Sequence, residues 1–278
     1  MYNDYIKPED YTEPRCLLCD EAYGVTPQVK SVPQSRIIDK MNDYMSRNDY
    51  SGAERHLIYW LKEAQLGYDL GGELMVRNEL IGHYRKTGNR DAAFENAEAA
   101  IKLLDKLGYD GGRSAGITYI NAATAYNAFG DNEKSLKTFK RAQSAFEKMS
   151  SVDNELFGGL YNNMALTLVA LGRFDEAFFY YDKALLCMKD VKNGELEMAI
   201  TYLNMADAYS ASIGSQEAES KIYGLLDTAY DLLNTQSLPR NGYYAFVCEK
   251  CAPTFSYYGY FAAANEFNRK AKEIYERN

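Results

Sequence analysis

The feature of this sequence that most constrains its fold is an internal repeat of about 42 residues. The string Tyr-x-x-Ala-Ala-x-x-Tyr at residues 119–126 returns in related form at 161–168 and 202–209, with weaker copies from residues 37, 77 and 248. Each copy of such a repeat buries its apolar face only against its neighbours, which is typical of solenoids. The fifth position of the string gives the markers Met41, Ile81, Ala123, Ala165, Ala206 and Ala252, spaced by 40, 42, 42, 41 and 46 residues. Six copies therefore cover the chain from Gln34 onward, and the 278 residues do not have to be divided into globular domains.

Each copy contains the pattern of two helices joined by a turn. The first segment has apolar residues at i, i+3, i+4 and i+7, which is the period of an amphipathic helix. A turn follows, and it carries Gly88, Gly130, Gly172, Gly214 or Gly259 in five of the copies, since glycine suits a left-handed helix end. Small residues then recur in the second segment, and they let two helices approach closely. The pattern predicts a helical hairpin in each copy.

These residues resemble the tetratricopeptide repeat (TPR) family, whose pattern is an aromatic, a Leu-Gly pair, a tyrosine, and Ala-x-x-x-Phe in the second helix. The third and fourth copies match best, with Ala123 and Ala165 at the position of the family's glycine. The long period is similar to that of kinesin light chains and of bacterial peptide-sensing TPR proteins. The resemblance implies an all-α, right-handed superhelical solenoid of about six TPR-like helix-turn-helix hairpins over residues 34–278.

Residues 1–33 precede the repeat and are expected to form an N-terminal arm. They hold Pro8, Pro14, Pro27 and Pro33 and four tyrosines, without a helical period. A partly disordered leader and an ordered arm lying in the groove of the solenoid are both compatible with this pattern.

Composition excludes several classes of protein. The 31 basic and 39 acidic residues give a net charge of −8 without a basic stripe, so no nucleic acid is expected as a partner. No apolar run approaches the ~20 residues of a membrane span, and the start of the chain lacks the pattern of a signal peptide. We therefore expect a cytoplasmic protein without a membrane partner.

The sequence offers little material for catalysis or for binding a metal. His56 and His83 are the two histidines, and we find no phosphate-binding loop or nucleophile motif beside them. The pairs Cys16/Cys19 and Cys248/Cys251 share the C-x-x-C spacing but lie near opposite ends of the chain, so a shared zinc site is a weak alternative to buried or incidental thiols. We expect no enzymatic activity, no cofactor and no metal.

A row of asparagines is the strongest candidate for a binding site. Asn121, Asn163 and Asn204 occupy the same position of the first helix in three consecutive copies. An amide can both donate and accept, so such a row could pair with the backbone of an extended peptide, and the resemblance implies this use because members of the family have such rows. In the alternative interpretation, the asparagines tie neighbouring helices together or face water. The further residues expected to line the groove are Asn162, Asn78, Glu79, Arg85, Ile117, Ile120, Thr124, Leu166, Leu203 and Asp207.

The predicted function is that of a protein-interaction module or scaffold, which binds an extended segment of a protein or peptide partner in its concave groove. The competing hypothesis is a structural or self-associating solenoid, such as a homo-oligomer, whose groove is occupied by its own N-terminal arm.

Overall fold

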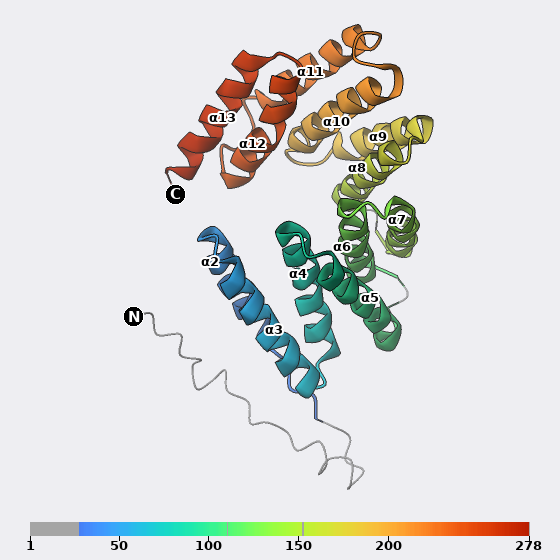
Figure 1. Ribbon diagram of the computed structural model, residues 1–278, viewed down its shortest axis with the longest axis vertical. Coiled ribbons are helices and arrows are strands. Elements are labelled where there is room, and N and C mark those ends of the chain that lie inside the picture. Colours follow the sequence, from blue (N-terminus) through green and yellow to red (C-terminus); the bar gives the residue numbers. More distant parts are fainter. Residues whose placement is uncertain (1–27, 110, 152, 278) are drawn as a thin grey trace. The chain divides into compact units, whose positions relative to one another are not determined.

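The computed structural model describes residues 28–277 apart from 110 and 152, and in these residues it is all helical, with twelve α-helices and no strand. The predicted all-α repeat class is therefore confirmed, with two helices for each copy (Figure 1). In chain order the helices are α2 (Gln34–Ser46), α3 (Tyr50–Leu66), α4 (Leu70–Thr87), α5 (Arg90–Leu107), α6 (Arg113–Ala128), α7 (Asn132–Glu147), α8 (Asn154–Ala170), α9 (Phe174–Met188), α10 (Glu195–Ile213), α11 (Glu219–Leu233), α12 (Gly242–Tyr257) and α13 (Phe261–Tyr275).

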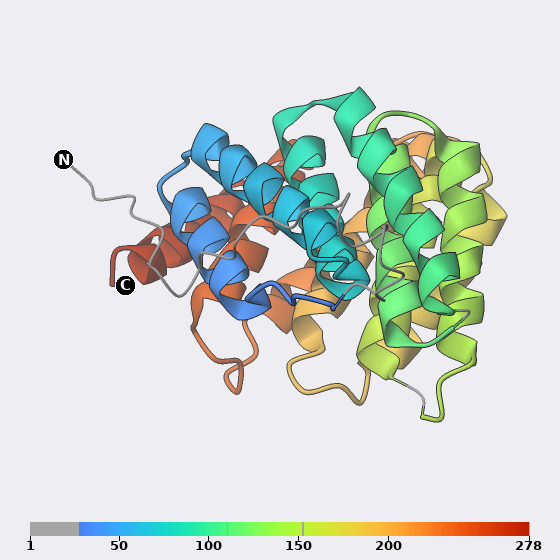
Figure 2. The ribbon, with the colours of Figure 1, turned by 90° about the horizontal axis from the view of Figure 1, so that it is seen from below.

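The chain divides into two compact units, Met1–Asp131 and Asn132–Asn278. In the first unit α3 contacts both α2 and α4, and α6 contacts α4 and α5. Helices α2 and α3 lie side by side in Figure 1 and in the perpendicular view of Figure 2. In the second unit each helix from α8 to α11 contacts the next one or its hairpin partner, and α12 packs on α13 and α10.

Local sequence explains where several helices begin and end. Asp49, Asp69, Asn89 and Asp153 each accept a hydrogen bond from the backbone N–H three residues later, which satisfies an amide that the helix leaves unpaired. At the other end of α4, Gly88 has φ +78°, as the turn pattern predicts.

Small residues form the contact surfaces inside both units. In the first unit Ala97 on α5 and Ala123 on α6 are fully buried, and the ring of Phe94 meets that of Tyr126 edge-on at 4.8 Å between centroids. In the second unit a continuous apolar cluster runs from α10 to α13 and includes Phe255 and Phe267, whose ring centroids are 5.3 Å apart. The alanines bring the helix axes together, and the aromatic rings fill the remaining space.

The end of the predicted arm that the structure describes lies against the turn between α3 and α4. Lys30 N donates to Gly67 O at 2.9 Å, and Val32 N donates to the Asp69 carboxylate at 2.9 Å. A Cβ on Gly67 would lie 2.5 Å from Lys30 O, so the close approach requires glycine there. Residues 1–27 lie outside the described residues, and the division of the chain at residue 34 stays a prediction, although α2 does begin there.

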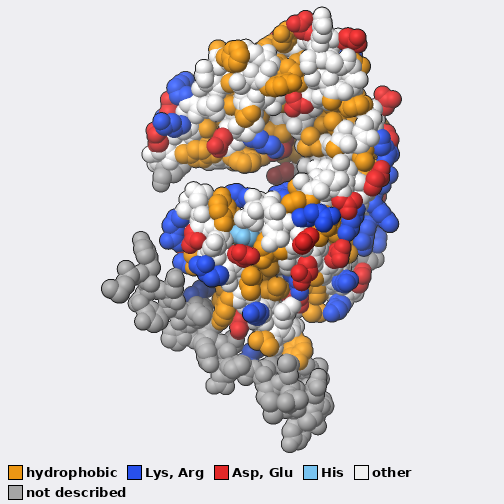
Figure 3. All heavy atoms as spheres, viewed as in Figure 1, with side chains coloured by type: hydrophobic (Ala, Val, Ile, Leu, Met, Phe, Trp, Pro, Cys, Tyr) orange, Lys and Arg blue, Asp and Glu red, His pale blue; other side chains and the backbone are white. Residues whose placement is uncertain are grey.

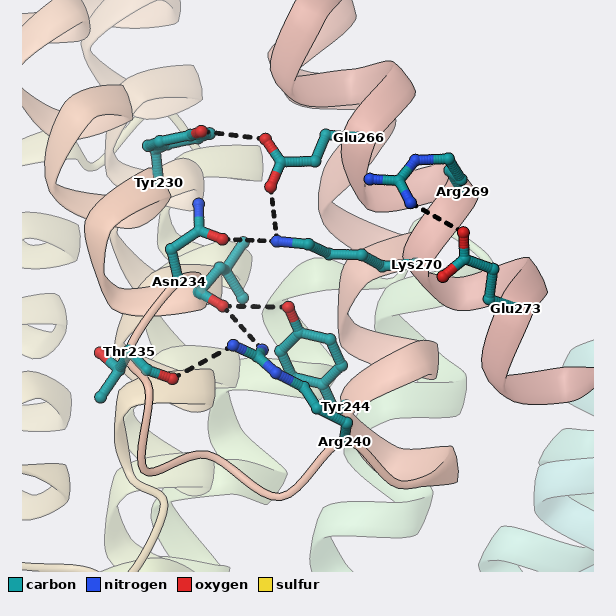
Figure 4. Close-up of polar contacts among 10 residues, drawn as sticks. Tyr230, Asn234, Thr235, Arg240, Tyr244, Glu266, Arg269, Lys270 and Glu273 are labelled. Atoms are coloured by element: carbon teal, nitrogen blue, oxygen red, sulfur yellow. Dashed lines mark hydrogen bonds and ion pairs between the residues drawn. The ribbon is translucent and has the colours of Figure 1, made fainter. Parts of the chain in front are cut away.

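The long connection between α11 and α12 is held by the end of α11. Leu233 O accepts hydrogen bonds from Arg240 Nη1 at 3.2 Å and from the Tyr244 hydroxyl at 3.1 Å, and Arg240 also donates to Thr235 O (Figure 4). The Arg240 guanidinium lies over the Tyr244 ring at 4.1 Å. These side chains satisfy carbonyls that the helix end leaves unpaired.

Candidate functional site

The candidate groove residues lie on the first helices of the copies, and these helices contact one another within each unit. In the first unit α4 contacts α6, and in the second unit α10 contacts both α8 and α12. The predicted asparagine row is therefore divided, with Asn121 in the first unit and Asn163 and Asn204 in the second.

In the first unit, asparagines join α4 to α6. Asn121 Nδ2 donates to Asn78 Oδ1 at 2.9 Å. Asn78 in turn donates to Thr118 Oγ1 at 3.1 Å and to Leu74 O at 2.9 Å. The amide of Asn78 is thus fixed on its own helix and presents its oxygen to the next copy.

The same arrangement recurs two copies later, in the second unit. Asn204 Nδ2 on α10 donates to Asn162 Oδ1 on α8 at 3.0 Å, and Thr201 Oγ1 lies 3.3 Å from the same oxygen. Sequence reasoning missed the threonines, although a Thr three residues before the Asn in both copies, at Thr118 and Thr201, was a readable signal. We call these two groups the asparagine ties.

Asn163 behaves differently from the residues of the asparagine ties. Its side chain is half-buried on α8 and makes no hydrogen bond to the part of the chain that the structure describes. One turn further along the same helix, Leu166 is 37% exposed. The neighbouring Asn162 is buried and accepts the hydrogen bond of the tie, so the two adjacent asparagines differ in burial and in contacts.

The other predicted groove residues fall into two groups. Ile117, Ile120 and Thr124 are half-buried on α6, Glu79 is half-buried on α4, and Arg85 is exposed at the end of α4. Burial raises the pKa of the Glu79 carboxyl. Leu203, in contrast, is 3% exposed and belongs to the apolar cluster of the second unit. The prediction that Leu203 lines a pocket for a ligand is corrected accordingly, because its side chain is enclosed by its own unit.

Asp207 belongs to a second kind of contact between copies. Burial raises the pKa of its carboxyl, while the Tyr258 hydroxyl, which donates to Asp207 Oδ1 at 2.9 Å, opposes that rise. Similar pairs connect the fifth and sixth copies elsewhere, and we call them the tyrosine–carboxylate ties. They are Tyr243 with Glu197, Tyr258 with Asp207, Tyr230 with Glu266 (Figure 4) and Tyr260 with Asp227.

The tyrosine–carboxylate ties use tyrosines that lie outside the repeat string. The ties of Tyr243 and Tyr258 join α12 and its C-terminal end to α10. The other two join α13 and the residue before it to α11. The Tyr230–Glu266 pair also includes Lys270, whose ammonium lies 2.5 Å from Glu266 Oε1. Burial alone would raise the pKa of Glu266, but the hydrogen bonds from Lys270 and Tyr230 lower it.

The two histidines and the two cysteines of α12 are buried or half-buried. His56 Nε2 donates to Ile37 O at 3.0 Å, and burial lowers the pKa of both His56 and His83. Cys248 and Cys251 are buried in α12, where burial raises the pKa of Cys251 to about 12. Cys16 and Cys19 lie outside the described residues.

Among residues 28–277, apart from 110 and 152, no cluster of three or more histidine, cysteine or acidic side chains could hold a metal ion. No described helix combines the length and apolarity needed to cross a bilayer.

Residues 159–186, which include most of α8 and α9, match the model of the tetratricopeptide repeat. The chain contains a tetratricopeptide repeat. The chain's fold is also that of solved TPR proteins: it resembles kinesin light chain TPR-like repeats from Podosopora anserina (17% identity, 73% of this chain and 95% of that one, TM-score 0.50). It also resembles NprR in complex with its cognate peptide NprX (17% identity, 94% of this chain and 73% of that one, TM-score 0.55).

A curated relative shares sequence over most of the chain. It is the clustered mitochondria protein homolog of Candida albicans, 28% identical over 236 residues. The match covers 77% of this chain and 16% of that protein, so the chain corresponds to a small part of its length. The resemblance to TPR proteins of the long-repeat and peptide-sensing kinds, predicted from the repeat string, is confirmed by the repeat match and the fold.

Proposed function

We propose that this chain is a protein-interaction module that binds an extended peptide segment on the surface formed by its first helices. The observation that carries the proposal is the unused hydrogen-bonding capacity of the asparagine row. Asn163 makes no side-chain hydrogen bond to the described residues, and Asn121 and Asn204 each donate one N–H and keep their carbonyl oxygen free of a described partner.

The asparagine ties supply the rigidity that such a site needs. In the second unit, Asn162 holds the Asn204 amide from the side of α8, so this amide keeps one orientation before a ligand arrives. Asn163 on α8 then offers a second amide one copy away. Because each amide has a donor and an acceptor, the pair can engage peptide backbone independently of side-chain identity. Leu166, exposed beside Asn163, supplies apolar contact.

The first unit offers the same chemistry on a single amide. Asn121 on α6 is held by Asn78, and Ile117, Ile120 and Thr124 lie on the same helix. Support for a peptide as the ligand comes from the resemblance to NprR, whose structure contains its cognate peptide. We extend that use to this chain on the basis of the amides themselves.

The experiment selects ligands from a library of random short peptides displayed on phage, with the full chain immobilised. We expect selected peptides to bind the double variant Asn163→Ala/Asn204→Ala about tenfold or more weakly, because two hydrogen bonds of about 1 kcal/mol each are lost. The matched control is Asn265→Ala/Asn268→Ala, which changes two exposed asparagines on α13. Equal loss in both variants, or no loss in the first, would contradict the proposal.

A deletion separates this proposal from a groove filled by the chain's own arm. Removing residues 1–27 leaves Lys30 and Val32 in place against the α3–α4 turn. We expect the affinity for selected peptides to be unchanged by this deletion. A clear gain in affinity would favour the competing hypothesis, in which the arm occupies the surface.

A further inference from the structure

The second unit has a surface cavity, open to solvent and about 620 Å³ in volume, at the turns of its last two hairpins. Its walls come from the α10–α11 turn, the start of α11 and the α12–α13 turn, and they are lined by Ser215, Gln216, Glu219, Ile222, Tyr223, Tyr257, Tyr258 and Gly259. A volume of this size falls in the range of small-ligand sites. No groove residue predicted from the sequence lines it, but Tyr258 joins it to Asp207 through their hydrogen bond.

The aromatic walls are fixed by contacts between rings. Tyr223 lies 5.9 Å from Tyr260, whose hydroxyl donates to Asp227, and Tyr257 meets Tyr258 edge-on at 4.9 Å between centroids. The side chains of Tyr257 and Tyr223 are nevertheless 74% and 41% exposed. On the face seen in Figure 3, apolar side chains reach the surface over these C-terminal helices. The wall of the cavity therefore presents large exposed aromatic rings whose positions are set by contacts with neighbouring rings.

The charge of the cavity has one sign. Glu219 is its single ionisable group other than tyrosine, and no lysine or arginine lines it. No described cation forms an ion pair with Glu219, and the nearest lysine in sequence, Lys221, has its ammonium over the Tyr209 ring at 4.8 Å. The hydroxyls of Tyr223 and Tyr257 and the Gln216 amide also make no hydrogen bond to the described residues, so the cavity holds an exposed carboxylate at the start of α11 together with polar groups that can still accept hydrogen bonds.

We propose that this cavity binds the guanidinium of an arginine side chain in the partner peptide. A planar guanidinium stacks on aromatic faces, is weakly hydrated, and presents several donors to a carboxylate and neighbouring oxygens, which is the chemistry that the cavity leaves unused. Lysine is a poorer fit, since its ammonium is compact and strongly hydrated. The inference rests on the proposed function only for the origin of the arginine, because the cavity itself can be tested with a small molecule.

The experiment measures binding of N-acetyl-arginine amide to the full chain by nuclear magnetic resonance titration, with N-acetyl-citrulline amide as the neutral analogue of the same shape. We expect shifts confined to the cavity residues with the arginine compound and none with citrulline at equal concentration. Glu219→Gln and Tyr257→Ala should each weaken binding by about fivefold or more. Glu217→Gln, which changes an exposed acid of the same turn outside the lining, should leave it unchanged within about twofold.

The outcomes are distinct from those of the proposed function. Equal binding of citrulline, no binding of either compound, or binding that survives both Glu219→Gln and Tyr257→Ala would overturn the arginine site. Asn163→Ala/Asn204→Ala should leave binding of N-acetyl-arginine amide unchanged even where it abolishes capture of selected peptides. A failure of the asparagine row therefore leaves the cavity result standing, and the reverse holds as well.

Discussion

Two neighbouring joints in the second unit are built from different polar chemistry. Between the fourth and fifth copies, the joint is the asparagine tie of Asn162 and Asn204, which is neutral. Between the fifth and sixth copies, four tyrosine–carboxylate ties cross from one hairpin to the other. The asparagine tie consists of amides on first helices and does not titrate, whereas the tyrosine–carboxylate ties contain groups that can gain or lose a proton.

The comparison also separates what holds a joint together from what gives it specificity. Both joints bury small and apolar residues, and burial of apolar area contributes most of the free energy of folding. A neutral hydrogen bond adds about 1 kcal/mol, and one to a charged group about 1.5–3 kcal/mol before exposure to solvent reduces it. The polar ties therefore set the register between copies, and the cores supply the larger part of the stability.

The largest expected effect comes from the core of the second joint. Phe255 is fully buried between Phe267 and Tyr260, so Phe255→Ala should lower the free energy of unfolding by about 3–5 kcal/mol. Chemical denaturation followed by circular dichroism measures the change. Tyr257→Ala, two residues away and 74% exposed, is the control, and it should cost less than about 0.5 kcal/mol. A loss for Phe255→Ala as small as that for Tyr257→Ala would show that the apolar core does not dominate the stability of this joint.

The next largest effect is expected from the asparagine tie, and it is compared with the effect of a substitution at the adjacent Asn163. Asn162→Ala removes the acceptor of Asn204 Nδ2, whereas Thr201 keeps a bond to Glu197 O at 2.9 Å. We expect a loss of about 1–3 kcal/mol in unfolding free energy for Asn162→Ala. Asn163→Ala, at the adjacent position without a described partner, should lie within about 0.5 kcal/mol of the parent. Equal losses would mean that Asn163 also serves the fold, which would weaken its proposed role toward a ligand.

The two kinds of joint show how far sequence reasoning reaches. The 42-residue period, the hairpin in each copy and the left-handed glycine turns could be read from spacing, because they depend on contacts within about one repeat. The asparagine tie was foreseen only as an alternative to ligand binding, and one row contains residues that join helices, Asn121 and Asn204, beside Asn163, which has no described side-chain partner. Leu203 was assigned to the groove because helical spacing does not reveal which face the next hairpin covers.

The tyrosine–carboxylate ties could not be read from the sequence at all. Their partners lie 33 to 51 residues apart, and each pairing depends on the register between two hairpins. The composition gave one indication of such contacts, because the chain has 25 tyrosines, more than the positions of the repeat string require. The cavity lined by Tyr257 and Tyr258 is a consequence of the same register, which only the folded chain displays.

Alkaline pH should distinguish the two joints. Burial and the hydrogen bond to Asp227 raise the pKa of Tyr260 to about 12, and burial also raises the pKa of Tyr243 and Tyr258. The folded state then holds protons that the unfolded state loses near pH 10, so stability is complete below that pH and is lost as pH rises toward 12. We expect the melting temperature to fall by about 5 °C or more across this window.

The triple variant Tyr243→Phe/Tyr258→Phe/Tyr260→Phe is the test of that assignment. It should flatten the alkaline fall in melting temperature, because the tied phenols no longer titrate. Absorbance of phenolate in the parent should show a tyrosine fraction that ionises only with unfolding. An alkaline fall of the same size in the variant would place the titrating groups outside the second joint.

The smallest expected effect is the loss of stability on removing a single tyrosine–carboxylate tie, and the size of that loss should depend on pH. Tyr258→Phe removes the hydrogen bond that opposes the burial-induced rise in the pKa of Asp207, so that pKa should increase further above its unfolded value. A raised carboxyl pKa favours the folded state at low pH and penalises it once the unfolded carboxyl has ionised. The loss of stability in Tyr258→Phe should therefore be about 1 kcal/mol near pH 7 and smaller near pH 3. Urea denaturation at the two values of pH measures the difference, with Tyr257→Phe as the control at the adjacent exposed ring. A loss that does not depend on pH would show that Tyr258 acts through packing and not through the charge of Asp207.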